Sequence, residues 1–182
     1  MPFDPSQVYS PAEDTFLLLR VAQDEIHPTD RVLEVGTGSG VIAAALGKLA
    51  YSVVATDINP HATAQVHVQG IDVVRADLCN GLQGKFDLVI FNPPYLPTQP
   101  HERIGDWLEY ALDGGLSGRD VIERFAADVR DVLAPAGRIL LLISSLTGLQ
   151  EVSGIFFSQG YFVSVVNEQW VEDEILYVLR IA

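Results

Sequence analysis

Cysteine is almost absent from this sequence: its 182 residues include one, Cys79, and the four histidines are scattered without the spacing of metal ligands. A single cysteine excludes a disulfide framework and any zinc site built from cysteine ligands. We therefore expect a cytoplasmic protein in a reducing compartment, with no metal bound to this chain. Zinc, if it takes part in the function, is expected on a partner.

Basic residues are scarce and dispersed. Eleven Lys and Arg against 24 Asp and Glu give a formal net charge of −13. The summed field of such a protein repels phosphate backbones, which weighs against DNA or RNA as a direct substrate. Direct action on nucleic acid is therefore a disfavoured class of function.

Long apolar segments are missing as well. No run approaches the roughly 20 residues that a helix needs to cross a bilayer, and residues 1–7 carry neither the basic segment nor the apolar stretch of a secretory signal. We expect a soluble protein. Its length and its 48% hydrophobic content predict a single compact domain over residues 1–182 with a sizeable core.

What the sequence does contain is an alternation of short apolar runs with helical periods. We predict strands over residues 31–35, 52–56, 71–75, 86–91, 138–143, 161–166 and 175–181. We predict helices over residues 15–22, 41–49, 121–133 and 149–158. The fold class is therefore α/β: a doubly wound, mostly parallel, seven-stranded sheet that ends in an antiparallel hairpin. Its crevice is expected above the first and fourth strands.

The segment Asn92-Pro93-Pro94-Tyr95 follows the fourth predicted strand directly. Consecutive prolines hold the backbone extended and lack N–H donors, so the carbonyl oxygens of this segment are free to face a ligand. The Asn92 side-chain oxygen and the Pro93 carbonyl can accept the two N–H bonds of a planar NH2 group while Tyr95 packs against it. The alternative is a proline-rich turn in which Asn92 caps its own backbone.

A glycine loop follows the first predicted strand, with Glu34, Gly36, Gly38 and Gly40 at alternate positions. It lacks the G-x-G-x-x-G spacing of a pyrophosphate site, and Glu34 places negative charge where phosphates would lie. A cofactor with an amino-acid end and a sulfonium, and without phosphate, suits this loop better. A turn that serves packing alone remains the alternative.

Two aspartates follow the next strands. Asp57 ends the second strand, roughly 20 residues after the glycine loop, where an acid can bind both hydroxyls of a ribose. Asp77 follows the third strand and can accept from an adenine amine while Leu78 covers the ring, or it can simply cap the next turn. The pair Glu13-Asp14 either begins the first helix or places carboxylates near the reacting methyl group.

These motifs together resemble a class I S-adenosylmethionine-dependent methyltransferase of the branch that methylates amino groups, with its Rossmann-like fold. Residues 8–18 (VYSPAEDTFLL) resemble, more narrowly, the amino-terminal signature of the archaeal and eukaryotic glutamine methyltransferases that modify class I translation release factors. Residues 111–115 and 118–120 are similar to the family's Gly-Gly and Gly-Arg segment near the substrate pocket.

The resemblance implies methyl transfer from S-adenosylmethionine to N5 of the glutamine in the Gly-Gly-Gln motif of a class I release factor. It implies catalytic roles for Asn92, Pro93 and Tyr95, and a pocket for the glutamine that includes Pro94. The implied cofactor-binding residues are Thr15, Glu34, Gly36, Gly38, Gly40, Asp57, Ile58, Asp77, Leu78 and Asn92.

The resemblance also implies a partner, a small zinc-binding activator subunit that forms a heterodimer by adding a strand to the sheet edge at residues 71–75. An edge shielded by its own loop is the alternative. Residues 1–30 do not supply the helical substrate-recognition domain of related bacterial enzymes. We therefore expect a loop over residues 96–118, or the partner, to recognise the release factor.

Other functions are compatible with parts of the pattern. An adenine-N6 methyltransferase acting on nucleic acid would use the same Asn-Pro-Pro-Tyr pocket for a flipped adenine, although the net charge disfavours it. A binding module that keeps the fold without turnover is a further alternative, disfavoured because every cofactor position that the family expects is filled.

Overall fold

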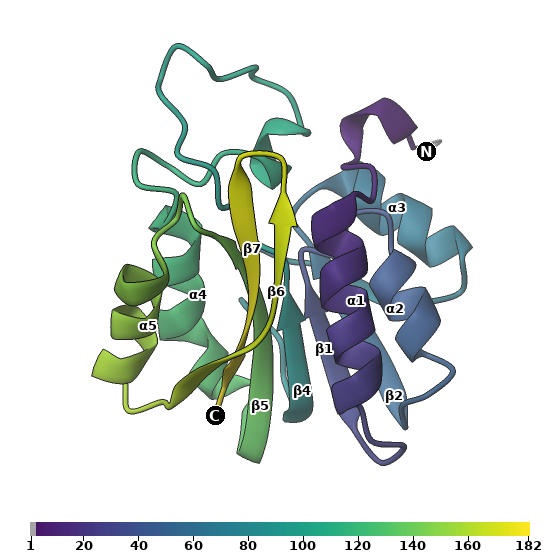
Figure 1. Cartoon of the computed structure of the whole chain (residues 1–182). Helices are drawn as coiled ribbons and strands as arrows, with labels where there is room; N and C mark the ends of the chain where they lie inside the picture. The colour runs from purple at the N-terminus through teal and green to yellow at the C-terminus, as the bar shows by residue number, and fades with distance from the viewer. Residues whose placement is uncertain (1–2) are drawn as a thin grey trace.

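Residues 3–182 are the part of the chain that the computed structural model describes, and they form a single mixed sheet with helices on both faces (Figure 1). The strands are β1 (Arg31–Val35), β2 (Ser52–Asp57), β3 (Asp72–Arg75), β4 (Phe86–Phe91), β5 (Leu133–Ser144), β6 (Val163–Val171) and β7 (Glu174–Ile181). The helices are α1 (Glu13–Glu25), α2 (Val41–Leu46), α3 (Pro60–Val68), α4 (Asp120–Asp128) and α5 (Leu149–Ser158).

The strand order is β3-β2-β1-β4-β5-β7-β6. Strands β1 to β5 pair in parallel, and β7 pairs antiparallel with both β5 and β6. The predicted α/β class, with a mostly parallel sheet and a C-terminal antiparallel hairpin, is therefore confirmed. Because β1 lies between β2 and β4, the chain reverses its direction of travel across the sheet there, which is the switch point where such sheets bind ligands.

Buried apolar side chains cover both faces of the sheet, as the period of two along a strand requires. In β4, Leu88 and Ile90 pack on the face covered by α1 and α2, while Val89 and Phe91 pack on the face covered by α4 and α5 (Figure 1). All four side chains are at most 2% exposed. The central strands are thus anchored on both sides, which fixes the position of the loops that follow them.

The predicted bounds of β1, β4 and α5 are confirmed. Helix α3 was missed, because it buries only Ala62 and Val66 and so shows a weak apolar stripe. Its start nevertheless carries a readable signal: Asn59 caps it by accepting from the His61 N–H, and Pro60 occupies the first turn.

Several other predictions were wrong in their bounds; the helix predicted over 41–49, for example, ends as α2 at Leu46. The helix predicted over 121–133 ends as α4 at Asp128, and β5 begins at Leu133, five residues before the predicted start. The sequence Ala-Pro-Ala-Gly inside β5 is typical of a turn, but the strand continues through it with Ala136 in the left-handed region (φ 61°). Strand β6 likewise extends to Val171 instead of 166.

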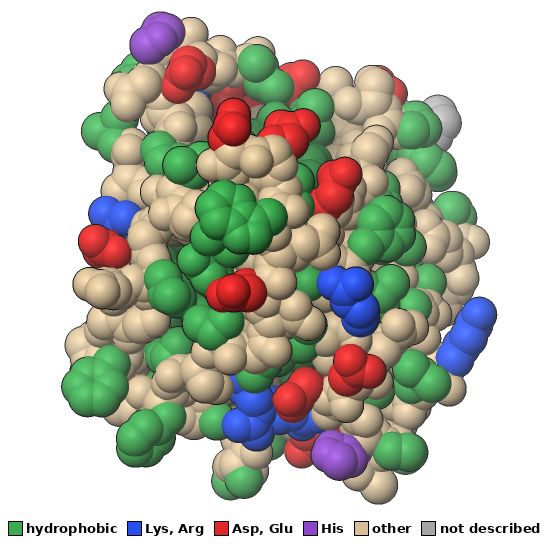
Figure 2. Space-filling view, in the orientation of Figure 1, with side chains coloured by type: hydrophobic (Ala, Val, Ile, Leu, Met, Phe, Trp, Pro, Cys, Tyr) green, Lys and Arg blue, Asp and Glu red, His purple; other side chains and the backbone are tan. Residues whose placement is uncertain are grey.

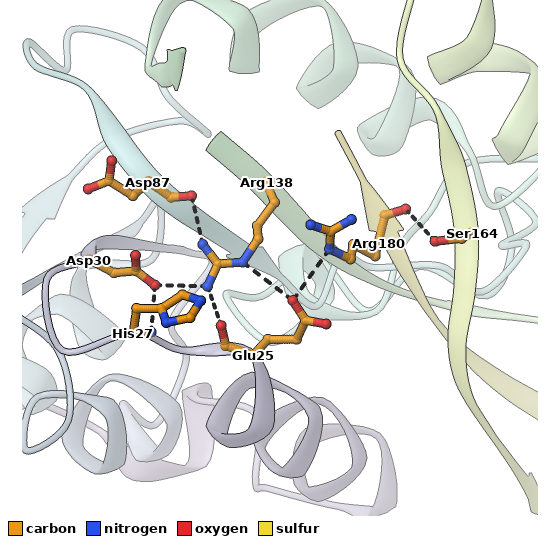
Figure 3. A network of polar contacts seen from close by, with 7 residues as sticks. All are labelled: Glu25, His27, Asp30, Asp87, Arg138, Ser164 and Arg180. Carbon is orange, nitrogen blue, oxygen red and sulfur yellow. Dashed lines mark hydrogen bonds and ion pairs between the residues drawn. The ribbon is translucent and has the colours of Figure 1, made fainter. Parts of the chain in front are cut away.

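A buried ionic network closes the end of the sheet opposite to the switch point (Figure 3). Arg138 of β5 is 8% exposed; its guanidinium lies 2.8 Å from the Asp30 carboxylate and 3.4 Å from that of Glu25. It also donates to the backbone carbonyls of Glu25 and Asp87, and Arg180 pairs with Glu25 at 3.4 Å. The network joins α1, β4, β5 and β7.

Within residues 3–182, none of the helices has the length and apolar character needed to cross a membrane.

Candidate active site

A cavity of about 190 Å³ opens where β1, β2 and β4 end, at the predicted crevice. The loops that follow these strands, the start of α1 and the segment around residue 110 line it. Most residues predicted to form the site line this cavity: Thr15, Glu34, Gly36, Gly38, Asp57, Ile58, Asp77, Leu78, Asn92, Pro93, Pro94 and Tyr95.

The glycine loop approaches the cavity closely at two of its three glycines. Gly36 and Gly38 have φ of 63° and 54°, which side chains rarely adopt. Within residues 3–182, no heavy atom lies within 4 Å of a Cβ added to Gly38, so this position faces open space. Gly40 does not line the cavity: a Cβ there would lie 2.8 Å from Val66 of α3. Gly40 therefore packs against α3, and its predicted contact with a cofactor stays a prediction.

Glu34 is buried beneath this loop. One of its carboxylate oxygens accepts from the Thr37 hydroxyl at 2.7 Å and from the Ala43 N–H at 2.9 Å. Burial raises the pKa of Glu34 to about 8, although these two hydrogen bonds act in the opposite direction. A cation in the cavity would favour the charged carboxylate, so the site is suited to a positively charged group.

Asp57 links the second strand to the glycine loop. Its carboxylate accepts from the backbone N–H groups of Gly38 and Asn59, both at 2.8 Å. Burial raises the pKa of Asp57, and the backbone donors oppose this effect. Each carboxylate oxygen can accept more than one hydrogen bond, so Asp57 retains capacity to bind hydroxyl groups.

Asp77 and Leu78 lie at the wall of the cavity. The Asp77 carboxylate pairs with the Arg124 guanidinium of α4, and both side chains are about half exposed (40% and 52%). Its side chain is therefore engaged across the cavity wall, not in capping the next turn. Leu78 has φ of 55°, and its carbonyl accepts from the buried Thr56 hydroxyl at 3.2 Å. Arg124 is a cavity residue that the sequence prediction missed.

Asn92 has one satisfied and one unsatisfied end. Its Nδ2 donates to the Asp14 carboxylate at 2.9 Å. Its Oδ1 is buried, and within residues 3–182 no group donates a hydrogen bond to it. Asn92 does not cap its own backbone, so the alternative of a self-capped turn is wrong. Tyr95 is half-buried beside it; burial, and then the nearby Asp14, raise the pKa of its phenol, which stays protonated.

The glycines of the segment after residue 112 support this loop from behind. A Cβ on Gly114 would lie 2.8 Å from the Pro94 carbonyl oxygen, and a Cβ on Gly118 would overlap the Tyr95 carbonyl oxygen. The buried Thr147 hydroxyl donates to that same Tyr95 oxygen at 3.0 Å. The segment thus fixes the backbone of the loop that carries Asn92.

Asp14 and Glu13 have different surroundings. Asp14 is 5% exposed and contacts Asn92, whereas Glu13 is exposed at the helix start.

Two aromatic side chains that line the cavity were also missed by the sequence prediction. Trp107 and Tyr110 stack with ring centroids 5.2 Å apart. Their signal in the sequence was an aromatic pair in a loop otherwise rich in glycine and charge. Within residues 3–182, no group of His, Cys, Asp and Glu side chains is arranged to hold a metal ion.

Comparisons with known proteins agree with this geometry. The profile of the methyltransferase small domain matches residues 9–106. The chain is 38% identical, over 96% of its length and 91% of the relative's, to a Methanocaldococcus jannaschii protein named for N5-glutamine methyltransferase activity. It is 37% identical to human methyltransferase HEMK2, over 96% and 89% of the two chains. A solved structure of the E. cuniculi Mtq2–Trm112 complex, described as responsible for methylation of the eRF1 termination factor, matches with a TM-score of 0.79, 30% identity and coverage of 96% and 98%.

Proposed function

Because this chain belongs to the methyltransferase small domain family, and within it to the protein N5-glutamine methyltransferases, we propose that it methylates a translation release factor. The enzyme uses S-adenosylmethionine and transfers the methyl group to N5 of a glutamine side chain. The acceptor in this proposal is the glutamine of the Gly-Gly-Gln motif of a class I release factor.

The residues around the glycine loop fit S-adenosylmethionine. The cofactor supplies a methyl group on a positively charged sulfur, next to an amino-acid end and an adenosine. Gly38 leaves open space for a close approach, and buried Glu34 lies where a cation would stabilise its charged form. Asp57 would bind the ribose hydroxyls with its remaining acceptor capacity. Thr15, Ile58, Asp77 and Leu78 complete the proposed cofactor site.

The observation that carries the proposal is the unsatisfied Oδ1 of Asn92. A buried carbonyl without a donor is rare in folded proteins, and Asn92 lines the cavity, which supports a ligand as the source of the missing donor. The Oδ1 of Asn92 and the Pro93 carbonyl would accept the two N–H bonds of the glutamine amide. Tyr95, with Pro94, would pack against the planar amide group.

The proposed chemistry depends on position and polarisation. The nitrogen lone pair of a primary amide is delocalised into its carbonyl and is a weak nucleophile. Two acceptors around the NH2 group favour a geometry in which the lone pair faces the methyl group in line with the breaking bond, and the nitrogen then loses one proton. The close approach of Gly114 and Gly118 to the Pro94 and Tyr95 carbonyls supports this role, and the Thr147 hydroxyl holds the Tyr95 carbonyl by a hydrogen bond.

The loop over residues 96–118 is the proposed docking surface for the release factor. Its residues 96, 107 and 110–112 line the cavity, and the loop exposes Leu96, Ile104, Tyr110 and Leu116 by 37–64%. Carboxylates lie among apolar side chains at the upper end of the molecule in Figure 2, where Figure 1 places this loop. An ion pair of 3.0 Å joins Arg103 to Asp113 within this loop.

We also propose that the chain acts in the cytoplasm, where release factors act. There it forms a heterodimer with a small zinc-binding activator, as the resemblance to the archaeal and eukaryotic enzymes implies. The Mtq2 relative was solved as a complex with Trm112. Here, β3 is an edge strand, and its Val74 side chain is 44% exposed. Addition of a strand from the partner would satisfy the free backbone groups of β3 and cover this apolar surface.

The direct test is incorporation of labelled methyl groups. The chain, alone and with a zinc-ribbon activator, is incubated with labelled S-adenosylmethionine and a release factor whose motif carries either Gln or Ala. Label on the Gln substrate that disappears with Ala supports the proposal. Label retained with Ala, or found only on adenine in added nucleic acid, contradicts it.

A further inference from the structure

Asp14 lies at the centre of a buried hydrogen-bond network. Its Oδ1 accepts from the Thr15 N–H at 2.6 Å and the Thr15 hydroxyl at 3.1 Å. Its Oδ2 accepts from the Tyr9 hydroxyl at 3.2 Å and from Nδ2 of Asn92 at 2.9 Å. Contact with a residue 78 positions away is not needed to begin a helix, and the exposed Glu13 already places an acid in the first turn.

This network decides which end of the Asn92 amide is bound by Asp14 and which end is left without a partner within residues 3–182. An asparagine amide can rotate by 180° and exchange its oxygen with its NH2 group, and the two ends have opposite hydrogen-bonding character. An ionised carboxylate only accepts hydrogen bonds, so Asp14 matches the Nδ2 end of Asn92 and not the Oδ1 end. The oxygen is consequently turned to the other side, where it is buried and, within residues 3–182, receives no hydrogen bond.

We propose that Asp14 is a positioning residue that holds Asn92 with its amide oxygen toward the substrate, so that the site accepts N–H donors. This inference rests on the proposed function, because it assigns the Asn92 oxygen to the NH2 group of the glutamine. Asp14 touches neither reacting atom in this arrangement and acts through Asn92. Tyr9 supports it by donating to the same carboxylate oxygen.

The arrangement has a consequence for specificity. If the Asn92 amide were rotated, its NH2 group would face the NH2 group of the substrate, and two donors would oppose each other. Loss of Asp14 is therefore expected to reduce the turnover of the glutamine substrate far more than the affinity for S-adenosylmethionine, which the glycine loop and Asp57 hold.

Asp14→Asn is the informative variant, because asparagine has one acceptor oxygen where the network needs two. Either the Thr15 donors or Nδ2 of Asn92 then faces another donor. We expect kcat for glutamine methylation to fall by about 100-fold, the scale of a misplaced catalytic group, with an unchanged Kd for the cofactor. Glu13→Gln, the same kind of change at the exposed neighbour, is the matched control and is expected to leave kcat unchanged.

The reciprocal exchange separates positioning from a general structural role. In the double variant Asp14→Asn, Asn92→Asp, the amide at 14 donates to the carboxylate at 92, and an acceptor oxygen again faces the cavity with the pair's net charge conserved. We expect this double variant to regain roughly tenfold or more of the kcat lost in Asp14→Asn, a coupling typical of residues in contact. Additive losses in the two single variants and the double variant would overturn the inference.

A measurement on the unmodified protein covers the case in which these variants fail to fold. NMR on the labelled chain detects scalar coupling through the hydrogen bond between Nδ2 of Asn92 and the Asp14 carboxyl carbon; its absence overturns the inference. The outcome is separable from that of the proposed function. If the native enzyme does not methylate glutamine, the proposed function fails while this coupling still reports the orientation of Asn92. If it does methylate glutamine and Asp14→Asn is folded and fully active, only the positioning role fails.

Discussion

Replacement of Glu34 by glutamine is expected to make the protein less sensitive to alkaline pH. The folded protein holds a proton on Glu34 more tightly than the unfolded chain does, because burial raises the pKa from 4.5 to about 8. The resulting stability is fully present below pH 4.5 and is lost as the pH rises through about 8. At 1.36 kcal/mol per unit of pKa, the loss amounts to ~5 kcal/mol across this range.

Glutamine at position 34 has nearly the same shape and cannot ionise. Its side-chain oxygen can accept from the Thr37 hydroxyl and the Ala43 N–H, as one oxygen of Glu34 does now. The difference in unfolding free energy between Glu34→Gln and the native protein is therefore expected to shift in favour of the variant, by ~4 kcal/mol as an upper bound, between pH 5 and pH 8.

The assay is urea denaturation followed by circular dichroism at several pH values. Differences between the two proteins are used because other ionisable groups affect both equally. Glu123→Gln, at an exposed position of α4, is the control and should stay within about 0.5 kcal/mol of the native protein throughout. A difference for Glu34→Gln that does not change with pH would refute the argument that Glu34 is buried and protonated.

Four further predictions concern catalysis, loop position, the ionic network and the partner. Asn92→Ala is expected to lower kcat by about 100- to 1,000-fold with a smaller effect on cofactor Kd, both measured with the Gln substrate; near-native turnover would remove Asn92 from the mechanism. Gly118→Ala should destabilise the fold by more than about 1 kcal/mol and lower kcat, since its Cβ would overlap the Tyr95 carbonyl oxygen and displace the loop behind the pocket. Gly81→Ala has a similar φ (78° against 73°) and no heavy atom of residues 3–182 within 4 Å of the added Cβ, so it should cost about 1 kcal/mol of stability and leave kcat unchanged. Arg138→Met removes the ion-pair partner of buried Asp30, which keeps, within residues 3–182, only the His27 N–H as a donor, and should cost about 3–5 kcal/mol in urea denaturation. Val73→Pro removes an N–H from the free side of β3 and should weaken activator binding at least about tenfold by calorimetry, whereas Val73→Ala, which keeps the N–H, should bind nearly as well as the native chain.

The choice of Val73 follows from the sheet register. The Ala76 N–H donates to the Asp57 carbonyl of β2 at 3.1 Å. Because N–H groups along a strand alternate in direction, that of Val74 also faces β2 and that of Val73 faces away from it. Proline at position 73 therefore leaves the ladder between β2 and β3 intact. Equal binding of the proline and alanine variants would show that the activator does not pair with this edge.

Strands buried on both faces were the most predictable part of the fold. The apolar runs of β1 and β4 are bounded by Asp30 and Gly36 and by Lys85 and Asn92, which mark their ends, and their bounds were predicted correctly. Helix α3 and the start of β5 were not, because local composition and tertiary context disagree there. Most residues of α3 are half-buried and only Ala62 and Val66 are fully buried, so its apolar stripe is weak. In β5, Leu133 and Arg138 pair with Phe86 and Leu88 of β4, and the turn-like residues 134–137 between them bulge from the ladder.

In the candidate site, the types of residue could be predicted from the sequence, but the orientation of their side chains could not. The kinds of side chain that line the cavity could be predicted, because glycines, acids and the Asn-Pro-Pro-Tyr segment occupy strand ends that any sheet of this class brings together. The hydrogen-bond and ion-pair partners of these side chains could not be predicted. The pairing of Asp77 with Arg124, and of Asp14 with Asn92, depends on how α4 and α1 are rotated against the sheet, and a spacing of 47 or 78 residues does not encode that rotation.

The pairing of Asp14 with Asn92 matters most, because it changes what the sequence motif means. An asparagine at a strand end offers an acceptor and a donor, and the motif alone does not specify which of them meets the ligand. A carboxylate behind the amide removes that ambiguity, since it can satisfy only the donor end. The capacity to bind an NH2 group therefore belongs to the pair of residues. It follows that Asn92→Ala and Asp14→Asn should impair the same step, and that their effects on kcat should not add.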